Sequence, residues 1–253
     1  MGSETDPVRP LISLIVPVWQ DDELLVHLVT GLRVGPELAE WVVVAVSPAQ
    51  KLCDLDRSGV IRLITCDQPS RGRQMNAGAV VARGTLLCFH HCDSELRYEH
   101  VGALARAARD ATILGGAFHR RFDDRRPWMK WRQPLVRWLH SLGGPVFGDQ
   151  SIFVRASVFR RLGGFADIPL MEDLEFSRRL RRLGRLKLLD PPIWSSPRRF
   201  QRLGVGWTTL LNITFICLFY FGVDSHRLHR WYYRLSWKRS SRHKASSPLA
   251  QTL

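Results

Sequence analysis

The chain has 253 residues, and its 37 lysines and arginines against 23 aspartates and glutamates give a formal net charge of +14 with the histidines neutral. With 45% hydrophobic and 24% charged residues the composition is that of a globular protein, which excludes a disordered, collagen-like or coiled-coil chain. The positive charge favours an anionic partner, whether a nucleotide, a nucleic acid or an acidic lipid.

The chain begins with a polar tail, residues 1–10, that lacks the basic and apolar regions of a signal peptide. The five cysteines form no C-x-x-C pair, so neither a disulfide framework nor a zinc ribbon is indicated. We therefore expect a protein with reduced cysteines that stays in the cytoplasm.

Short apolar runs and helical patterns alternate over the first half of the chain. Strands are expected at 11–18, 41–46, 60–64 and 85–89 and around 112–114, with helices at 24–32, 72–82 and 101–108 between them. This alternation predicts an α/β protein with a mostly parallel, doubly wound sheet flanked by helices. Polar residues after the strands, at 19–21, 47 and 91–93, should then share the edge where ligands gather.

The middle of the chain is less regular. A mixed-charge loop is expected at 120–126, a tryptophan-bearing helix at 128–138, a turn at 143–145 and a strand at 151–154. From Asp173 a helix should carry Phe176, Leu180 and Leu183 inward, with its arginines (Arg178, Arg179, Arg181 and Arg182) outward.

The end of the chain combines an apolar segment with a basic one. Residues 203–223 hold no charge, and from Arg227 onward there are basic residues but no acidic one. The length is at the threshold for a membrane span. We favour an apolar helix lying in the membrane interface at the inner face of the cell membrane, with a basic tail facing anionic lipid. The alternative is a helix docked on the core with a solvated tail.

Two acidic sites follow predicted elements. His91 and Asp93 come after a buried strand, where an imidazole and a carboxylate can hold a divalent cation, although Asp93 as a helix N-cap is an equal alternative. A zinc site at residues 88–92 is disfavoured because neighbouring residues of a strand point to opposite faces. Asp173, at a helix start beside Glu172, is a candidate general base, although capping alone also explains an acid there.

Two further segments carry weaker signals. Arg71, Arg73 and Asn76 stand at a helix N-terminus, where arginines and free N–H groups can meet phosphate. Asp149 and Gln150 open a strand after a glycine-rich turn.

Taken in order, the motifs resemble those of family 2 glycosyltransferases with the GT-A fold, and more narrowly the bacterial subgroup associated with radical-SAM and selenodomain proteins. The resemblance covers about residues 11–200. It rests on ISLIVPV near the start, RGRQMNAGAVVARG at 71–84, LLCFHHCDSEL at 86–96, GDQSIFVR at 148–155 and LGGFADIPLMEDLEFSRRLRRLGR at 162–185.

We therefore expect three parts: the tail 1–10, a glycosyltransferase domain at 11–200 that the resemblance covers, and a membrane-associated helix with its basic tail at 201–253. The resemblance implies inverting transfer of a sugar from a nucleotide-diphosphate donor. We expect the acceptor to be a hydroxyl of a lipid-linked or small molecule. The implied roles are as follows: Asp173 is the catalytic base; His91 and Asp93 bind Mn²⁺ or Mg²⁺ with the diphosphate; Pro17, Val18, Trp19, Asp21, Arg71, Arg73 and Asn76 line the donor side; and Asp149, Gln150 and Glu172 face the acceptor.

The sequence departs from the family pattern at the second strand. Family members usually keep an aspartate there for the nucleotide, whereas no acid lies between Trp41 and Cys53. This motivates an alternative, a non-catalytic GT-A-like protein that binds an anionic ligand or a membrane surface. A nucleotidyltransferase is disfavoured because the first strand lacks a glycine-rich loop, and nucleic-acid binding is not expected because no recognised module is present.

Overall fold

The computed structural model describes residues 10–122, 146–195 and 205–245. The tail at 1–9, most of the mixed-charge loop, the tryptophan-bearing helix and the turn at 143–145 lie outside the described residues. The chain divides into two compact units. One is formed within residues 1–167 and 173–195, and the other within residues 168–172 and 196–253.

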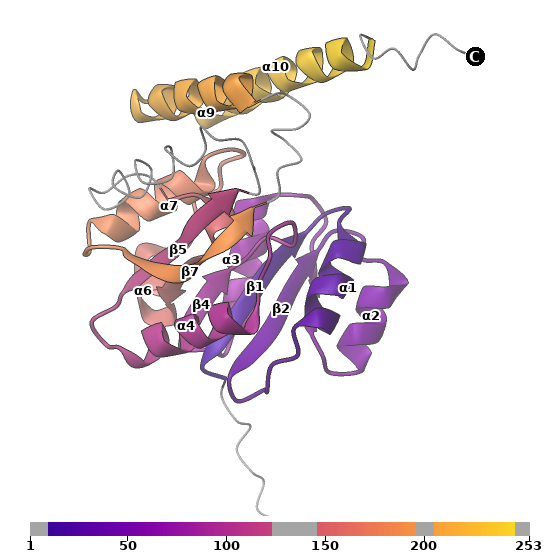
Figure 1. Ribbon diagram of the computed structural model, residues 1–253, viewed down its shortest axis with the longest axis vertical. Helices are drawn as coiled ribbons and strands as arrows, with labels where there is room; N and C mark the ends of the chain where they lie inside the picture. Colours follow the sequence, from indigo (N-terminus) through magenta and orange to yellow (C-terminus); the bar gives the residue numbers. More distant parts are fainter. Residues whose placement is uncertain (1–9, 123–145, 196–204, 246–253) are drawn as a thin grey trace, which may run out of the picture. The chain divides into compact units, whose positions relative to one another are not determined.

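The first unit is built on a seven-stranded sheet (Figure 1). Six strands run in one direction, and β6 alone is antiparallel to its neighbours β4 and β5. The mostly parallel sheet predicted from the sequence is thus confirmed. In the spatial order β3-β2-β1-β4-β6-β5-β7, the strands are Arg62–Thr65, Ala39–Ala45, Ile12–Val18, Leu86–Phe89, Ile152–Arg155, Gly115–Phe122 and Lys187–Ser195.

Helices cover both faces of this sheet because alternate residues of the buried strands are apolar on both sides. Leu14 and Val16 of β1 pack with residues of α1, α2 and α4, whereas Ile15 packs with residues of α3, α6 and α7. These helices are α1 Asp22–Gly31, α2 Gln50–Arg57, α3 Arg71–Val81, α4 Tyr98–Arg109, α6 Ala156–Leu162 and α7 Glu172–Arg181, with a short 3-10 turn, η1, at Gly148–Gln150.

Three local expectations are corrected. The strand expected around 112–114 begins at Gly115, because the Asp110 carboxylate accepts hydrogen bonds from the N–H and hydroxyl of Thr112 and stabilises a turn there. On α7, Arg179 is not outward: its guanidinium is half-buried and bound to protein groups. Leu183 lies beyond the end of α7 and is 36% exposed.

The second unit contains a helical hairpin. Helix α9, Val205–Tyr220, and helix α10, Ser225–Ala245, share a small core of Leu211, Phe215, Leu228 and Tyr232, against which Leu170 and Met171 pack. The Tyr232 hydroxyl also donates a hydrogen bond to Asn212. The expected basic tail is therefore a helix as far as Ala245. Over the part of the chain that the structure describes, no helix has the combined length and apolar character needed to cross a membrane.

Candidate active site

Polar residues gather where the parallel strands end. Trp19–Asp21 follow β1, His90–Ser94 follow β4, and Gly148–Ser151 precede the antiparallel β6, so all three segments lie at one edge of the sheet. Gln20, Ser47 and Ser151 at this edge have φ between 51 and 63°, in the left-handed region that non-glycine residues seldom adopt. Such backbone is a feature of functional edges, where the fold holds strained residues in place.

Gly148 is the point at which two predicted site residues meet. Its N–H donates a hydrogen bond to Asp173 Oδ2 at 2.7 Å. A Cβ built on Gly148 would lie 2.7 Å from His91 Nε2 and 3.5 Å from Asp173 Oδ2. The imidazole and the carboxylate therefore face the same small volume, although 82 positions separate them in the sequence.

Burial sets the protonation of both groups. Burial raises the pKa of Asp173. Hydrogen bonds from the N–H groups of Gly148 and Leu174 and the positive charge of Arg71 partly offset this rise. Burial, with the nearby charge of Arg71, lowers the pKa of His91 to about 3. At neutral pH His91 is uncharged and keeps a nitrogen lone pair, while the raised pKa makes Asp173 a stronger base than a solvated carboxylate.

Asp149 lies beside this pair and is held by an arginine. Arg120 Nη1 donates to both carboxylate oxygens of Asp149, at 3.1 and 2.9 Å, and its guanidinium stacks over the Phe147 ring. The negative charge of Asp149 works to raise the pKa values of both His91 and Asp173. Asp149 is therefore part of the site.

Gln150 is fully buried, and its role in the structure is to hold the turn. Its amide N–H donates to the Phe118 carbonyl, and its amide oxygen accepts from the N–H of Phe147. Glu172, the other residue assigned to the acceptor side, is also buried, at 6% exposure.

The carboxylates of Asp21 and Asp93 lie close enough to the thiol of Cys92 for their charges to shift its pKa. Burial and the charges of these two carboxylates together raise the pKa of this thiol to about 12, and the charge of Arg71 opposes them. The ends of β1 and β4 and the start of α3 thus contribute charged groups to one neighbourhood. Asp93 itself is exposed, so its carboxylate is accessible from solvent.

The loop after β4 is fixed by His90. This buried imidazole has a pKa lowered to about 3, mainly by burial. Its Nε2 donates to the Ser94 carbonyl at 3.2 Å, because a carbonyl can only accept, and its Nδ1 accepts from the Ser151 hydroxyl at 2.6 Å. The hydrogen bonds tie the segment that carries His91 and Asp93 to the start of β6.

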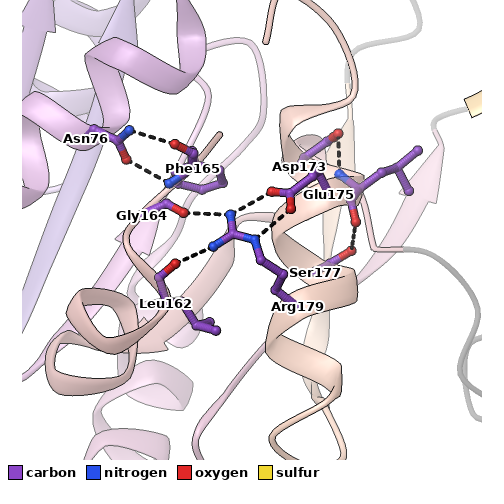
Figure 2. Close-up of polar contacts among 9 residues, drawn as sticks. Asn76, Leu162, Gly164, Phe165, Asp173, Glu175, Ser177 and Arg179 are labelled. Atoms are coloured by element: carbon purple, nitrogen blue, oxygen red, sulfur yellow. Dashed lines mark hydrogen bonds and ion pairs between the residues drawn. The ribbon is translucent and has the colours of Figure 1, made fainter. Parts of the chain in front are cut away.

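Helix α7, which carries Asp173, is clamped by Arg179 (Figure 2). The guanidinium of Arg179 donates two hydrogen bonds to Glu175, at 2.7 and 2.6 Å, and further ones to the carbonyls of Leu162 and Gly164. The arginine thus joins α7 to the loop after α6, which limits the movement of the candidate base.

Helix α3 is attached to the same loop. The Asn76 amide donates to the Phe165 carbonyl at 2.9 Å and accepts from its N–H at 2.8 Å, as Figure 2 shows. A Cβ on Gly164 would lie 2.6 Å from Asn76 Oδ1, and its φ is +75°, so only glycine fits there. Both polar groups of Asn76 are thus engaged within the protein, whereas Arg73 forms an exposed two-bond ion pair with Asp167.

At the end of β1 the predicted donor residues divide into two kinds. Pro17 and Val18 are buried, so only their backbone can contribute to a site, whereas Trp19 is 53% exposed and free to stack on a ligand. The buried amide of Gln74 donates to the carbonyls of Val18 and Val44, which joins α3 to the ends of β1 and β2.

Several of these roles were not predicted from the sequence. Gln74, His90 and Arg120 each bind a partner 29 or more positions away in the sequence. The only sequence feature that marked these three residues was a polar side chain next to an apolar run, and this feature does not identify a partner. Gly148 was predicted as a turn, and nothing in the sequence indicated that two site residues would face it.

Neither protein-family models nor the sequences of curated proteins match this chain. Solved structures do. The mannosyltransferase PcManGT from Pyrobaculum calidifontis, solved with GDP-Man and Mn²⁺, matches with a TM-score of 0.58 and 17% identity over 97% of this chain and 77% of that chain. S. aureus TarS 1-349 matches with a TM-score of 0.57 and 14% identity over 74% of this chain. The same TarS fragment in complex with UDP-GlcNAc matches with a TM-score of 0.57 and 16% identity.

The chain spans 61% of the TarS fragment's length. At this level of identity the similarity establishes the architecture. The chain has the GT-A fold of glycosyltransferases, as the sequence predicted.

Proposed function

We propose that this protein is a glycosyltransferase that moves a sugar from a nucleotide-diphosphate donor to a hydroxyl of an acceptor. The observation that carries the proposal is the approach of His91 and Asp173 to Gly148 at the strand ends. In an open α/β sheet this is the edge where nucleotides bind. Two neighbours of the same fold were solved with GDP-Man and with UDP-GlcNAc, which supports a nucleotide sugar as the donor here.

Asp173 is the proposed base. Its carboxylate removes the proton of the acceptor hydroxyl as that oxygen attacks the anomeric carbon, and the bond from that carbon to the diphosphate breaks on the opposite face. The product sugar has inverted configuration. The raised pKa of Asp173 favours this proton transfer, and the Arg179 clamp on α7 keeps the carboxylate at a fixed position.

A divalent cation is proposed to assist the leaving diphosphate. The uncharged imidazole of His91 and the exposed carboxylate of Asp93 are suitable ligands for Mn²⁺ or Mg²⁺. No cluster of three or more histidine, cysteine or acidic side chains among the described residues is arranged to hold a metal, so the other ligands would be diphosphate oxygens. When bound, the cation offsets the negative charge that grows on the leaving group.

The remaining assignments follow from position. Trp19, Asp21, Arg71 and Arg73 are proposed on the donor side, where Arg71 adds a positive charge beside His91. Asp149 is proposed on the acceptor side. Membership of family 2, and of the subgroup associated with radical-SAM and selenodomain proteins, remains part of the proposal because the neighbours share few residues with this chain.

A panel of nucleotide sugars tests the proposal. Each donor is supplied with Mn²⁺ or Mg²⁺, and thermal stabilisation and nucleotide release are measured. We expect at least one donor to stabilise the protein only with the metal and to release its nucleotide. Asp173→Asn should lower transfer by about 10²–10⁴-fold without unfolding the protein.

The matched control is Asp54→Asn, since Asp54 is an exposed carboxylate of α2 in the same unit, and this variant should retain turnover. Wild-type turnover in Asp173→Asn would refute the assignment of the base. Absence of metal-dependent stabilisation by every donor would favour the non-catalytic binding protein instead, a function suggested by the lack of an acid after β2.

A further inference from the structure

Helix α9 has two apolar faces, only one of which packs within its own unit. Leu211 and Phe215 belong to the core of the hairpin. On the other side, five residues with i, i+3, i+7 and i+10 or i+11 spacing form one exposed face, which we call the α9 stripe: Leu210, Ile213, Cys217, Tyr220 and Phe221. Phe221, just past the end of α9, is 86% exposed. A continuous exposed face of five mostly apolar side chains normally marks an interaction site.

The partner helix α10 is strongly basic. It contains seven lysines and arginines and no acidic residue, so half of the net charge of +14 lies in one helix. Of these, Arg227, Arg230 and Arg234 are exposed among the described side chains. Trp231 and Tyr233 are also about half exposed on this helix.

The two helices pack as a pair, so the stripe and the basic residues belong to one body. Tyr232 of α10 packs edge-on against Phe215 of α9, with ring centroids 5.2 Å apart, and donates a hydrogen bond to Asn212. The hairpin thus combines an apolar stripe, aromatic side chains and arginines. This is the composition of a helix that lies in a membrane interface, with apolar groups among the acyl chains and cations at the headgroups.

We propose that the α9–α10 hairpin docks on an anionic lipid bilayer, with the α9 stripe inserted at the headgroup boundary. Charge complementarity selects this partner, because the cytoplasmic leaflet has a negative surface potential and α10 is purely basic. A second copy of the chain would meet the same excess of positive charge, which disfavours self-association through α10. The proposal does not depend on glycosyl transfer, because it uses only residues of the second unit.

Vesicle flotation of the full chain tests this docking. Vesicles of phosphatidylcholine alone are compared with vesicles that also contain phosphatidylglycerol, at low and high salt. We expect binding to the anionic vesicles, weakened by salt and much weaker with phosphatidylcholine alone. The double variant Ile213→Asp/Phe221→Asp should bind at least tenfold more weakly. Reversing Arg230 and Arg234 to Glu should weaken binding by at least about fivefold per residue.

Matched controls separate the hairpin from general surface effects. Val80→Asp changes an apolar residue of α3 that is 84% exposed, and Arg178→Glu reverses an exposed charge of α7; both should bind vesicles as the wild type does. Helix content from circular dichroism checks folding, and the milder Leu210→Ser/Ile213→Ser variant replaces the aspartates if they unfold the hairpin.

Three results would overturn the proposal. The first is that the wild type fails to float with anionic vesicles. The second is that the stripe variants bind as well as Val80→Asp. The third combines two observations: the wild type does not bind vesicles, and light scattering shows a dimer that Ile213→Asp/Phe221→Asp converts to a monomer. The α9 stripe would then contact a second copy of the chain.

Discussion

Replacing Gly148 by alanine tests whether His91 and Asp173 form one site. The new methyl group would lie 2.7 Å from His91 Nε2, whereas ordinary contacts begin near 3.4 Å. The imidazole must therefore move by about 0.7 Å or rotate away. Because a misplacement of about 1 Å can cost about 10²-fold in rate, we expect Gly148→Ala to lower transfer by about 10- to 100-fold.

Stability should change less than activity. Overpacking costs about 1–3 kcal/mol. The backbone at Gly148 is not in the left-handed region, so alanine also stabilises by about 0.4–1 kcal/mol through the unfolded state. The expected net loss, about 0–2.5 kcal/mol, is measured by urea unfolding. Gly31→Ala is the matched control because no atom lies within 4 Å of its added Cβ, and it should keep full transfer.

A double-mutant cycle identifies the cause. His91→Ala removes the ring that the new methyl group would strike, so adding Gly148→Ala to that variant should cost little further activity. The placement of His91 beside Asp173 plays no part in the reaction if Gly148→Ala transfers sugar at the wild-type rate. The same conclusion holds if the losses of activity caused by the two substitutions are simply additive.

Three more outcomes follow from the structure. Arg179→Met should lower the free energy of unfolding by about 3 kcal/mol, since it removes charge-assisted bonds to two carbonyls and to Glu175; Arg178→Met is the control, and equal urea midpoints for the two variants would contradict the clamp. Arg73→Ala should change stability by less than about 1 kcal/mol because its ion pair with Asp167 is exposed, so a loss of donor stabilisation in this variant would indicate direct ligand binding.

The third concerns pH. Burial lowers the pKa of His100, so the unfolded chain binds more protons below its ordinary pKa of about 6.5, and the free energy of unfolding should fall as the pH drops below about 6.5. His100→Asn keeps an acceptor for the Arg97 N–H and should flatten that slope in urea titrations; an unchanged slope would show that His100 does not contribute to it.

Much of the site's outline could be predicted because strand ends are local. The apolar runs that end at Val18 and Phe89 place Asp21 and Asp93 at one edge of a parallel sheet. The roles of single side chains could not be predicted in this way. An asparagine beside two arginines looks the same whether it binds phosphate or, as Asn76 does, holds the backbone of Phe165.

The amino-acid pattern alone determined the α/β architecture, the shared edge of the sheet and the basic end of the chain, because hydrophobic periodicity and charge depend on near neighbours in sequence. Only the tertiary structure decided which polar groups meet. In the folded protein the guanidinium of Arg179 is bound to protein groups, and His91 and Asp173 both lie next to Gly148. Helix α9 packs against α10, and the α9 stripe stays exposed. These outcomes depend on contacts between distant segments, and a buried hydrogen bond is recognised only when both of its partners are in place.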